Sequence, residues 1–110
     1  TQIVRGSDLL DSTPRQLHLQ RLLGLPRPDY AHLPLAVDAE GVKLSKQNSA
    51  HALDTQHPVI ALWHALDFLN QTPPDTLRRA SLTTLWDWAR AHWSLARVAH
   101  TLSRPHPPFD

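Results

Sequence analysis

Two lysines lie three residues apart in the stretch Lys43-Leu44-Ser45-Lys46-Gln47-Asn48, with the hydroxyl group of Ser45 between them. The stretch follows Asp38-Ala39-Glu40-Gly41, which predicts a turn. Each ammonium group can approach a different phosphate oxygen as a point charge, so this loop suits a ligand with several phosphates. A Lys-x-x-Lys spacing is also common on solvated helix faces, so the spacing alone does not assign a phosphate site.

Arg5 is a second candidate because it ends a short run of strand-forming residues. Ligands of open α/β sheets bind at the carboxyl ends of the strands, and a guanidinium group can hold a carboxylate with two parallel hydrogen bonds. Arg5 is therefore a candidate for carboxylate binding. Asp8 follows in the same turn, where it either orients Arg5, lines the site or is an ordinary turn aspartate.

The elements that position these residues are mixed α/β in the first part of the chain. A strand is expected over residues 1–4, and Ser12 or Thr13 can cap a helix whose first position is Pro14. Gly24 predicts the end of this helix. A strand, a turn and a helix make half of a βαβ unit, the usual architecture of nucleotide-binding sheets. The apolar stripe of the helix consists of Leu17, Leu19, Leu22 and Leu23.

The next apolar run extends from Tyr30 to Val37 and predicts an edge strand, because Pro34 lacks the N–H group that a central strand requires. With the turn at residues 38–41, it predicts a loose hairpin that carries the lysine loop at its exit.

Residues 45–57 show no clear periodicity, and helical periodicity begins after His57. One helix is expected from about Pro58 to Asn70, and a second after Ser81. The proline-rich residues 103–110 predict an irregular tail. We therefore expect residues 1–48 to belong to an α/β catalytic domain and residues 49–110 to form a helical module. The apolar face of the second helix is expected to comprise Leu82, Leu85, Trp86, Ala89 and Trp93.

Composition narrows the classes of protein. The 110 residues have a net charge of only +1, which argues against a highly basic nucleic-acid coat protein. Cysteine is absent, which excludes a disulfide framework and thiolate zinc sites within these residues. No run resembles a signal peptide or a membrane span, which predicts a cytoplasmic protein. The lack of methionine and the immediate opening in a strand predict that the chain is the C-terminal portion of a longer polypeptide.

Other side chains with possible roles have simpler explanations. No two histidines show the helical i, i+4 spacing of a zinc-binding helix, so no metal ligand is assigned. Trp88 lies off the expected apolar face and is the one tryptophan predicted to be available for stacking on an unpaired base. Four arginines either contact RNA phosphates or form a solvated helix face. They are Arg78, Arg79, Arg90 and Arg97.

Several stretches, taken in order and spacing, resemble the class I glutamyl-tRNA synthetase family. They are residues 3–10, 12–16, 23–24, 30–35 and 43–46. The resemblance implies the second half of a Rossmann-type catalytic domain, with residues 43–47 as the second signature, the KMSKS loop. Gln47-Asn48 and the short helical remainder are similar to the glutamyl-Q tRNA(Asp) synthetases, the truncated paralogues within this family.

The resemblance also implies roles for individual residues. Lys46 and, second, Lys43 would contact ATP and stabilise the charge that develops on the departing pyrophosphate. Arg5 would bind the glutamate substrate. Ser45 belongs to the ATP loop, and the backbone at Ala36 would border the adenine. No metal ligand is expected in this chain, although ATP would bring Mg²⁺ and the family carries a zinc site in an earlier insertion.

The implied reaction is activation of glutamate with ATP without tRNA, followed by transfer to queuosine at the wobble position of tRNA(Asp). The implied protein is a monomer that does not bind membranes. These 110 residues alone are expected to be inactive, because the first signature loop is not among them. Two alternatives stay open: a fragment of an ordinary glutamyl-tRNA synthetase, and a non-catalytic helical module that binds RNA or protein.

Overall fold

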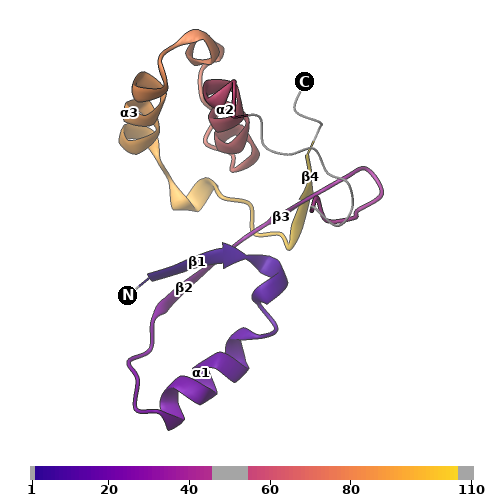
Figure 1. Cartoon of the computed structure of the whole chain (residues 1–110), viewed down its shortest axis with the longest axis vertical. Coiled ribbons are helices and arrows are strands. Elements are labelled where there is room, and N and C mark those ends of the chain that lie inside the picture. The colour runs from indigo at the N-terminus through magenta and orange to yellow at the C-terminus, as the bar shows by residue number, and fades with distance from the viewer. Residues whose placement is uncertain (1, 46–54, 107–110) are drawn as a thin grey trace.

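A computed structural model describes residues 2–45 and 55–106 of the chain. The fold is α/β and elongated, with extents of 50 × 34 × 24 Å. A βαβ unit lies at one end, a second pair of strands in the middle and a pair of helices at the other end (Figure 1). Within the described ranges, no helix has the length and apolar character needed to cross a membrane.

The βαβ unit consists of strand β1 (Gln2–Gly6), helix α1 (Thr13–Leu22) and strand β2 (Asp29–Leu33). The two strands are parallel, and their register places Arg5 opposite His32. A short 3₁₀ helix, η1 (Ser7–Leu9), joins β1 to α1. The expected strand, turn and helix are therefore confirmed, and β2 completes the unit. Parallel pairing needs such a crossover, since a tight turn joins only antiparallel strands.

The start of α1 differs from the prediction. Neither Ser12 nor Thr13 caps the helix in the expected way: Ser12 occupies the cap position in a helical backbone conformation and makes no side-chain cap bond. The Thr13 hydroxyl instead donates back to the Leu9 carbonyl at 3.0 Å. The chain enters α1 directly from turns that bond Ser12 N to Leu9 O and Thr13 N to Leu10 O, so a separate side-chain cap is not required.

Pro34 divides the expected single strand into two that pair with different partners. Before it, β2 pairs with β1; after it, strand β3 (Leu35–Val37) pairs in parallel with β4 (Ser103–Pro105). The prediction of an irregular tail is thus wrong for residues 103–105. Backbone bonds from Leu35 N to Leu102 O and from His106 N to Val37 O satisfy the exposed edge of β3, and Pro105 is tolerated because β4 is an edge strand.

The helical end contains α2 (Pro58–Phe68), η3 (Asp75–Arg79), α3 (Leu82–His92) and η4 (Leu95–Arg97). Both predicted helices are confirmed, and Ser81 caps α3 by accepting from Thr84 N at 3.1 Å. Apolar side chains from both helices form the main core. Its buried members are Trp63, Leu66, Leu85 and Ala89, with Val59, Leu62, Leu77 and Trp88 packed around them.

The predicted apolar face of α3 is only partly correct. Leu85 and Ala89 are buried, but Trp86 and Trp93 remain 44% and 45% exposed. Trp88, expected to lie off this face, packs against the core instead. The face that contacts α2 is therefore rotated toward position 88.

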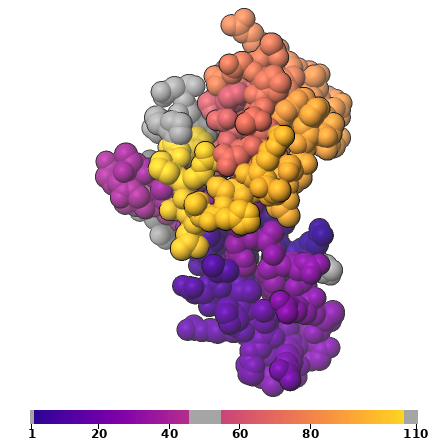
Figure 2. Space-filling model, turned by 180° about the vertical axis from the view of Figure 1, so that it is seen from behind, coloured from indigo at the N-terminus to yellow at the C-terminus, as the bar shows by residue number. Residues whose placement is uncertain are grey.

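A polar link connects the end of α2 to the segment after α3. Gln71 is 1% exposed, and its side-chain amide donates to Leu69 O and Ser94 O and accepts from Ser94 N. The residues on either side, Asn70 and Thr72, both have positive φ angles. The C-terminal residues after this link lie between the helical end and the βαβ end, as the yellow segment of Figure 2 shows.

Candidate active site

Arg5 lies near the carboxyl end of β1, and its guanidinium group is half-buried and firmly held. Its Nη1 donates to Gln16 Oε1 at 2.6 Å, and its Nη2 donates to Thr13 Oγ1 at 2.6 Å and to Leu9 O at 3.4 Å. Its Nε donates to His32 Nε2 at 3.2 Å. These bonds come from β2, from η1 and from the first turn of α1, so the βαβ unit with its connecting turn fixes the orientation of the guanidinium.

An aromatic ring completes the surroundings of Arg5. The guanidinium carbon lies 4.7 Å from the centroid of the Tyr30 ring, within the range of a cation–π interaction. Tyr30 in turn stacks on His32, with ring centroids 6.0 Å apart, and its hydroxyl accepts from Gln20 at 3.2 Å.

Sequence reasoning did not identify the residues around Arg5, although two signals for them exist. Thr13 and Gln16 are three residues apart and therefore share one face of α1. His32 stands opposite Arg5 in the parallel register. The second signal requires the pairing of β1 with β2, and the first does not by itself show that this face of α1 meets Arg5.

Asp8 pairs with Lys43. The Lys43 ammonium group lies 2.6 Å from Asp8 Oδ2, and both side chains are partly exposed. The hydrogen bond from Lys43 lowers the pKa of the Asp8 carboxyl below its ordinary value of 3.8, although partial desolvation opposes the shift. This ion pair joins the turn after Arg5 to the predicted phosphate-binding loop, so the structure brings two of the predicted site segments together.

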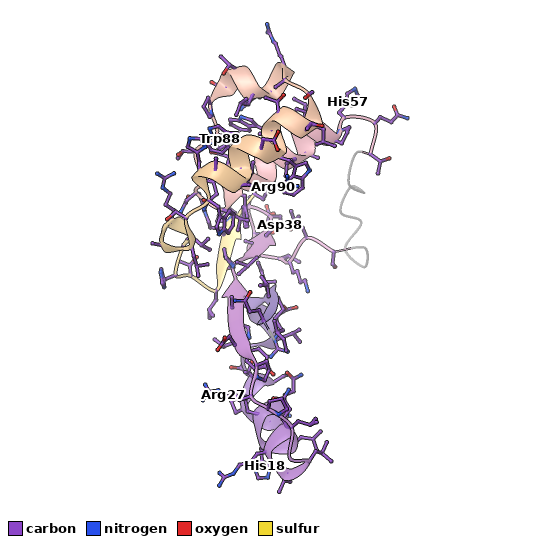
Figure 3. The ribbon with its side chains drawn as sticks, turned by 90° about the vertical axis from the view of Figure 1, so that its left-hand side faces the viewer. His18, Arg27, Asp38, His57, Trp88 and Arg90 are labelled. Carbon is purple, nitrogen blue, oxygen red and sulfur yellow. The ribbon has the colours of Figure 1, made fainter. Side chains whose placement is uncertain are left out.

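The hairpin that carries Lys43 has well-defined hydrogen bonds. Val37 and Lys43 form an antiparallel bridge, and Leu44 N donates to Ala36 O at 3.0 Å. Asp38 Oδ1 accepts from Glu40 N at 3.1 Å and from Val42 N at 2.7 Å, which closes the turn. The predicted hairpin is therefore confirmed, and Figure 3 labels Asp38 at its turn.

The structure also describes Ser45 and Ala36, two other residues predicted to contact ATP. Ser45 is partly buried at the exit of the hairpin. Ala36 lies in β3, where its carbonyl accepts from Leu44 N. Lys46, the first choice for the cation that meets the phosphates, lies outside the described residues.

An open groove of about 460 Å³ lies along β2, and Tyr30 and His32, which contact Arg5, are among its lining residues. It is lined by residues 30–33, by Leu95 and residues 98–102, and by Ser7 and Leu10. The Ser7 hydroxyl donates to Leu102 O across it. Lys43 and Ala36 do not line this groove, so it is separate from the predicted ATP residues.

Two of the arginines that were candidates for RNA phosphates have partners within the helical end. The Arg78 guanidinium stacks over the Trp63 ring at 3.8 Å and pairs with Asp75 at 3.3 Å. Arg97 donates to Gln71 O at 3.3 Å. Their positions have a structural explanation in the core and in the link at Gln71.

Two other candidates, Trp88 and Arg90, lie on α3 (Figure 3). Trp88, expected to be available for stacking on a base, instead packs on the core and stacks on His92 with centroids 4.9 Å apart. Arg90 is exposed and makes a long 3.5 Å contact with Asp87. The tryptophan side chains exposed to solvent in this region are those of Trp86, on α3, and Trp93, directly after it.

The described part of the chain contains no group of three or more histidine, cysteine, aspartate or glutamate side chains arranged to hold a metal ion. His64 lies against His106, and burial together with the Arg78 charge lowers the pKa of His64. Such surroundings disfavour the charged form of the imidazole.

Comparison with known proteins places this geometry in context. No family model matches the chain. A glutamyl-Q tRNA(Asp) synthetase from Aromatoleum aromaticum is 54% identical over 107 residues, which is 97% of this chain and 34% of that protein. Proteins of the same name from Methylococcus capsulatus and Xanthomonas oryzae are 49% and 54% identical, over 89% and 86% of this chain and 32% and 31% of their own lengths. The chain spans about a third of the length of these curated relatives.

Proposed function

The chain is a relative of the glutamyl-Q tRNA(Asp) synthetases, and we propose that its polypeptide activates glutamate with ATP and then glutamylates a tRNA. Activation proceeds without tRNA, and the glutamyl group goes to queuosine at the wobble position of tRNA(Asp). The observation that carries this proposal is the 54% identity over 107 residues to a protein of that name. The parallel βαβ unit, with Arg5 near the end of a strand, supports it.

In the proposed arrangement, residues 1–48 belong to a Rossmann-type catalytic domain and residues 49–110 to a helical module. Arg5 binds a carboxylate of glutamate. Lys43 and Lys46 meet the phosphates of ATP, Ser45 belongs to the same loop, and the backbone at Ala36 borders the adenine. ATP binds with Mg²⁺, and the described residues offer no cluster of three or more carboxylate or histidine side chains for the ion.

Activation joins a glutamate oxygen to the α-phosphorus of ATP and breaks the bond to pyrophosphate, which leaves with its electron pair. Negative charge grows on the leaving group, so a cation that meets it in the transition state lowers the barrier. Removal of one such positioned group costs about 2.7–4 kcal/mol of transition-state stabilisation. Transfer of the glutamyl group to the modified base then releases AMP.

The pairing of Lys43 with Asp8 has a consequence for this role. ATP phosphates and the Asp8 carboxylate compete for one ammonium group, so Lys43 exchanges its partner when ATP binds. The pair is partly exposed, where ion pairs are weak, so the exchange is readily reversible.

The first test is glutamate-dependent exchange of pyrophosphate into ATP by the complete polypeptide, with no tRNA present. We expect exchange in the wild-type protein and a loss of about a hundredfold or more when Lys46 is replaced by Ala. Absence of exchange without tRNA would refute the proposed activation step.

The second test concerns the acceptor. Labelled glutamate is supplied with tRNA(Asp) that contains queuosine and with tRNA(Asp) that carries unmodified guanosine at the wobble position. We expect label only on the first. Equal labelling of both would refute transfer to queuosine while leaving the activation step intact.

A further inference from the structure

The partners of Arg5 share a property that the proposed role does not require: every partner that the described residues offer is electrically neutral. They are an amide oxygen, a hydroxyl, a backbone carbonyl, an imidazole nitrogen and a phenol ring, contributed by Gln16, Thr13, Leu9, His32 and Tyr30. We call these five residues the neutral cradle. A half-buried arginine is more often paired with a carboxylate, because an unpaired buried charge is unfavourable.

The hydrogen bonds of the neutral cradle also define which edge of Arg5 remains available. A guanidinium group has five N–H donors. Nε uses its only hydrogen on His32, and Nη2 uses both of its hydrogens on Thr13 and Leu9. Nη1 uses one hydrogen on Gln16. Within the described part of the chain, the second hydrogen of Nη1 is thus the donor left for a ligand.

Gln16 is the key member because it bonds to the same nitrogen that keeps this hydrogen. Its oxygen lies 2.6 Å from Nη1, which orients the nitrogen without cancelling the charge of the guanidinium. Thr13 is buried and is itself held by Leu9 O, so it serves as a rigid second support.

We propose that Gln16, supported by Thr13, is a positioning residue that orients Arg5 for the glutamate carboxylate and, by its neutrality, keeps the charge of Arg5 for that substrate. This inference rests on the proposed role of Arg5 in glutamate binding. The carboxylate is bound through Nη1, with one hydrogen bond from this arrangement and the full guanidinium charge.

The test compares two changes at position 16 in the complete polypeptide, measured by ATP–pyrophosphate exchange. Gln16→Glu keeps an oxygen for Nη1 but supplies an internal carboxylate that competes with glutamate. We expect the KM for glutamate to rise about tenfold to a hundredfold, with the KM for ATP and the melting temperature nearly unchanged. Gln16→Met removes the acceptor without adding charge, and we expect a smaller rise.

Gln2→Glu is the matched control, because it adds the same charge to the exposed start of β1, away from the neutral cradle. It is expected to leave both KM values unchanged. If Gln16→Glu retains the wild-type KM for glutamate, the inference is wrong, since a purely structural glutamine would tolerate this substitution. If the Gln16 variants do not fold, the comparison of Thr13→Ser with Thr13→Val tests the same cradle, and equal KM values for glutamate would overturn it.

Arg5→Lys separates this inference from the proposed function. If Arg5→Lys leaves the KM for glutamate unchanged, the role of Arg5 itself is wrong. If Arg5→Lys raises this KM but Gln16→Glu does not, Arg5 binds glutamate and only the inference about the neutral cradle fails.

Discussion

At the scale of single residues, the Asp8–Lys43 pair gives a prediction about pH. Lys43 holds the pKa of Asp8 below 3.8, so the folded state favours the ionised carboxylate. The stabilisation from this pair is therefore fully present above pH 3.8 and is lost as the pH falls through the lowered pKa. An NMR titration of the Asp8 side-chain carboxyl should show this low value, and Lys43→Met should return it toward 3.8.

Arg21→Met is the control for this titration, because it removes a cation from the far end of α1, away from Asp8. It should leave the Asp8 titration unchanged. Identical Asp8 titrations in the wild type and in Lys43→Met would contradict the pairing.

Gly41 gives a second prediction at this scale. Its φ of +80° lies in the left-handed region, which side chains with a Cβ atom rarely adopt, although the surrounding space is open. We expect Gly41→Ala to lower the free energy of unfolding by about 1–2 kcal/mol, and Gly41→Asn to lower it less, because asparagine tolerates this conformation better. Denaturant unfolding of the complete polypeptide measures both. An alanine variant as stable as the wild type would show that the turn at Asp38 does not depend on glycine.

The sequence predicted single residues well where the chemistry is local. The turn at residues 38–41 and the bridge beside Lys43 follow from short-range signals, namely an aspartate that can accept from the backbone and a glycine for positive φ. The neutral cradle could not be predicted, because its members come from η1, α1 and β2 and meet around Arg5 only through the parallel register of β1 and β2.

At the scale of elements, α3 shows the limit of periodicity. Leu85 and Ala89 were predicted to be buried and are, whereas Trp86 and Trp93 were predicted to be buried and are not. An apolar stripe on a short helix spans a wide arc, and only the partner helix decides which part of that arc is covered. Here α2 covers the part that includes Trp88.

This packing gives a prediction for α3. Leu85 is fully buried in the core, so Leu85→Ala should lower the free energy of unfolding by about 2–5 kcal/mol through lost contacts and a cavity. Leu82→Ala, on the same helix but 36% exposed, should cost much less. Urea denaturation measures both values, and similar losses in the two variants would contradict the assigned face of α3.

The strands illustrate a different limit. Pro34 was predicted to lie within an edge strand, but it separates β2 from β3, and the sequence did not reveal that the chain changes partners there. The residues of β4 have weak strand propensity and include a proline, so local preference predicted an irregular tail. Hydrogen bonding to the exposed edge of β3 overrides that preference.

At the scale of the whole molecule, Gln71 connects parts of the helical end that are distant in sequence. Its amide bonds to both the N–H and the carbonyl of Ser94, in a position from which water is excluded. Gln71→Ala leaves these groups without their partner, and we expect a loss of about 1–3 kcal/mol in the free energy of unfolding. Gln71→Glu should be at least as harmful, because it loses the donated bonds and buries a charge.

Thr72→Ser is the control for Gln71, since it keeps the hydroxyl that donates to Gln71 O and alters only an exposed methyl group. Thermal unfolding of the complete polypeptide compares the three variants. A Gln71→Ala protein that melts at the wild-type temperature would show that this link does not stabilise the helical end.

The pairing of β3 with β4 also determines when, during folding, the hairpin that carries Lys43 gains its neighbouring strand. Leu35 pairs with Ser103, so most of the described chain lies between the two strands. Closing so long a loop is entropically unfavourable and slow, which places this contact late in folding. During synthesis, the hairpin with Lys43 therefore leaves the ribosome well before the strand beside it exists. Lys43 and the turn that precedes it are thus ordered locally first, and β3 acquires its partner strand only after the helical end has been translated.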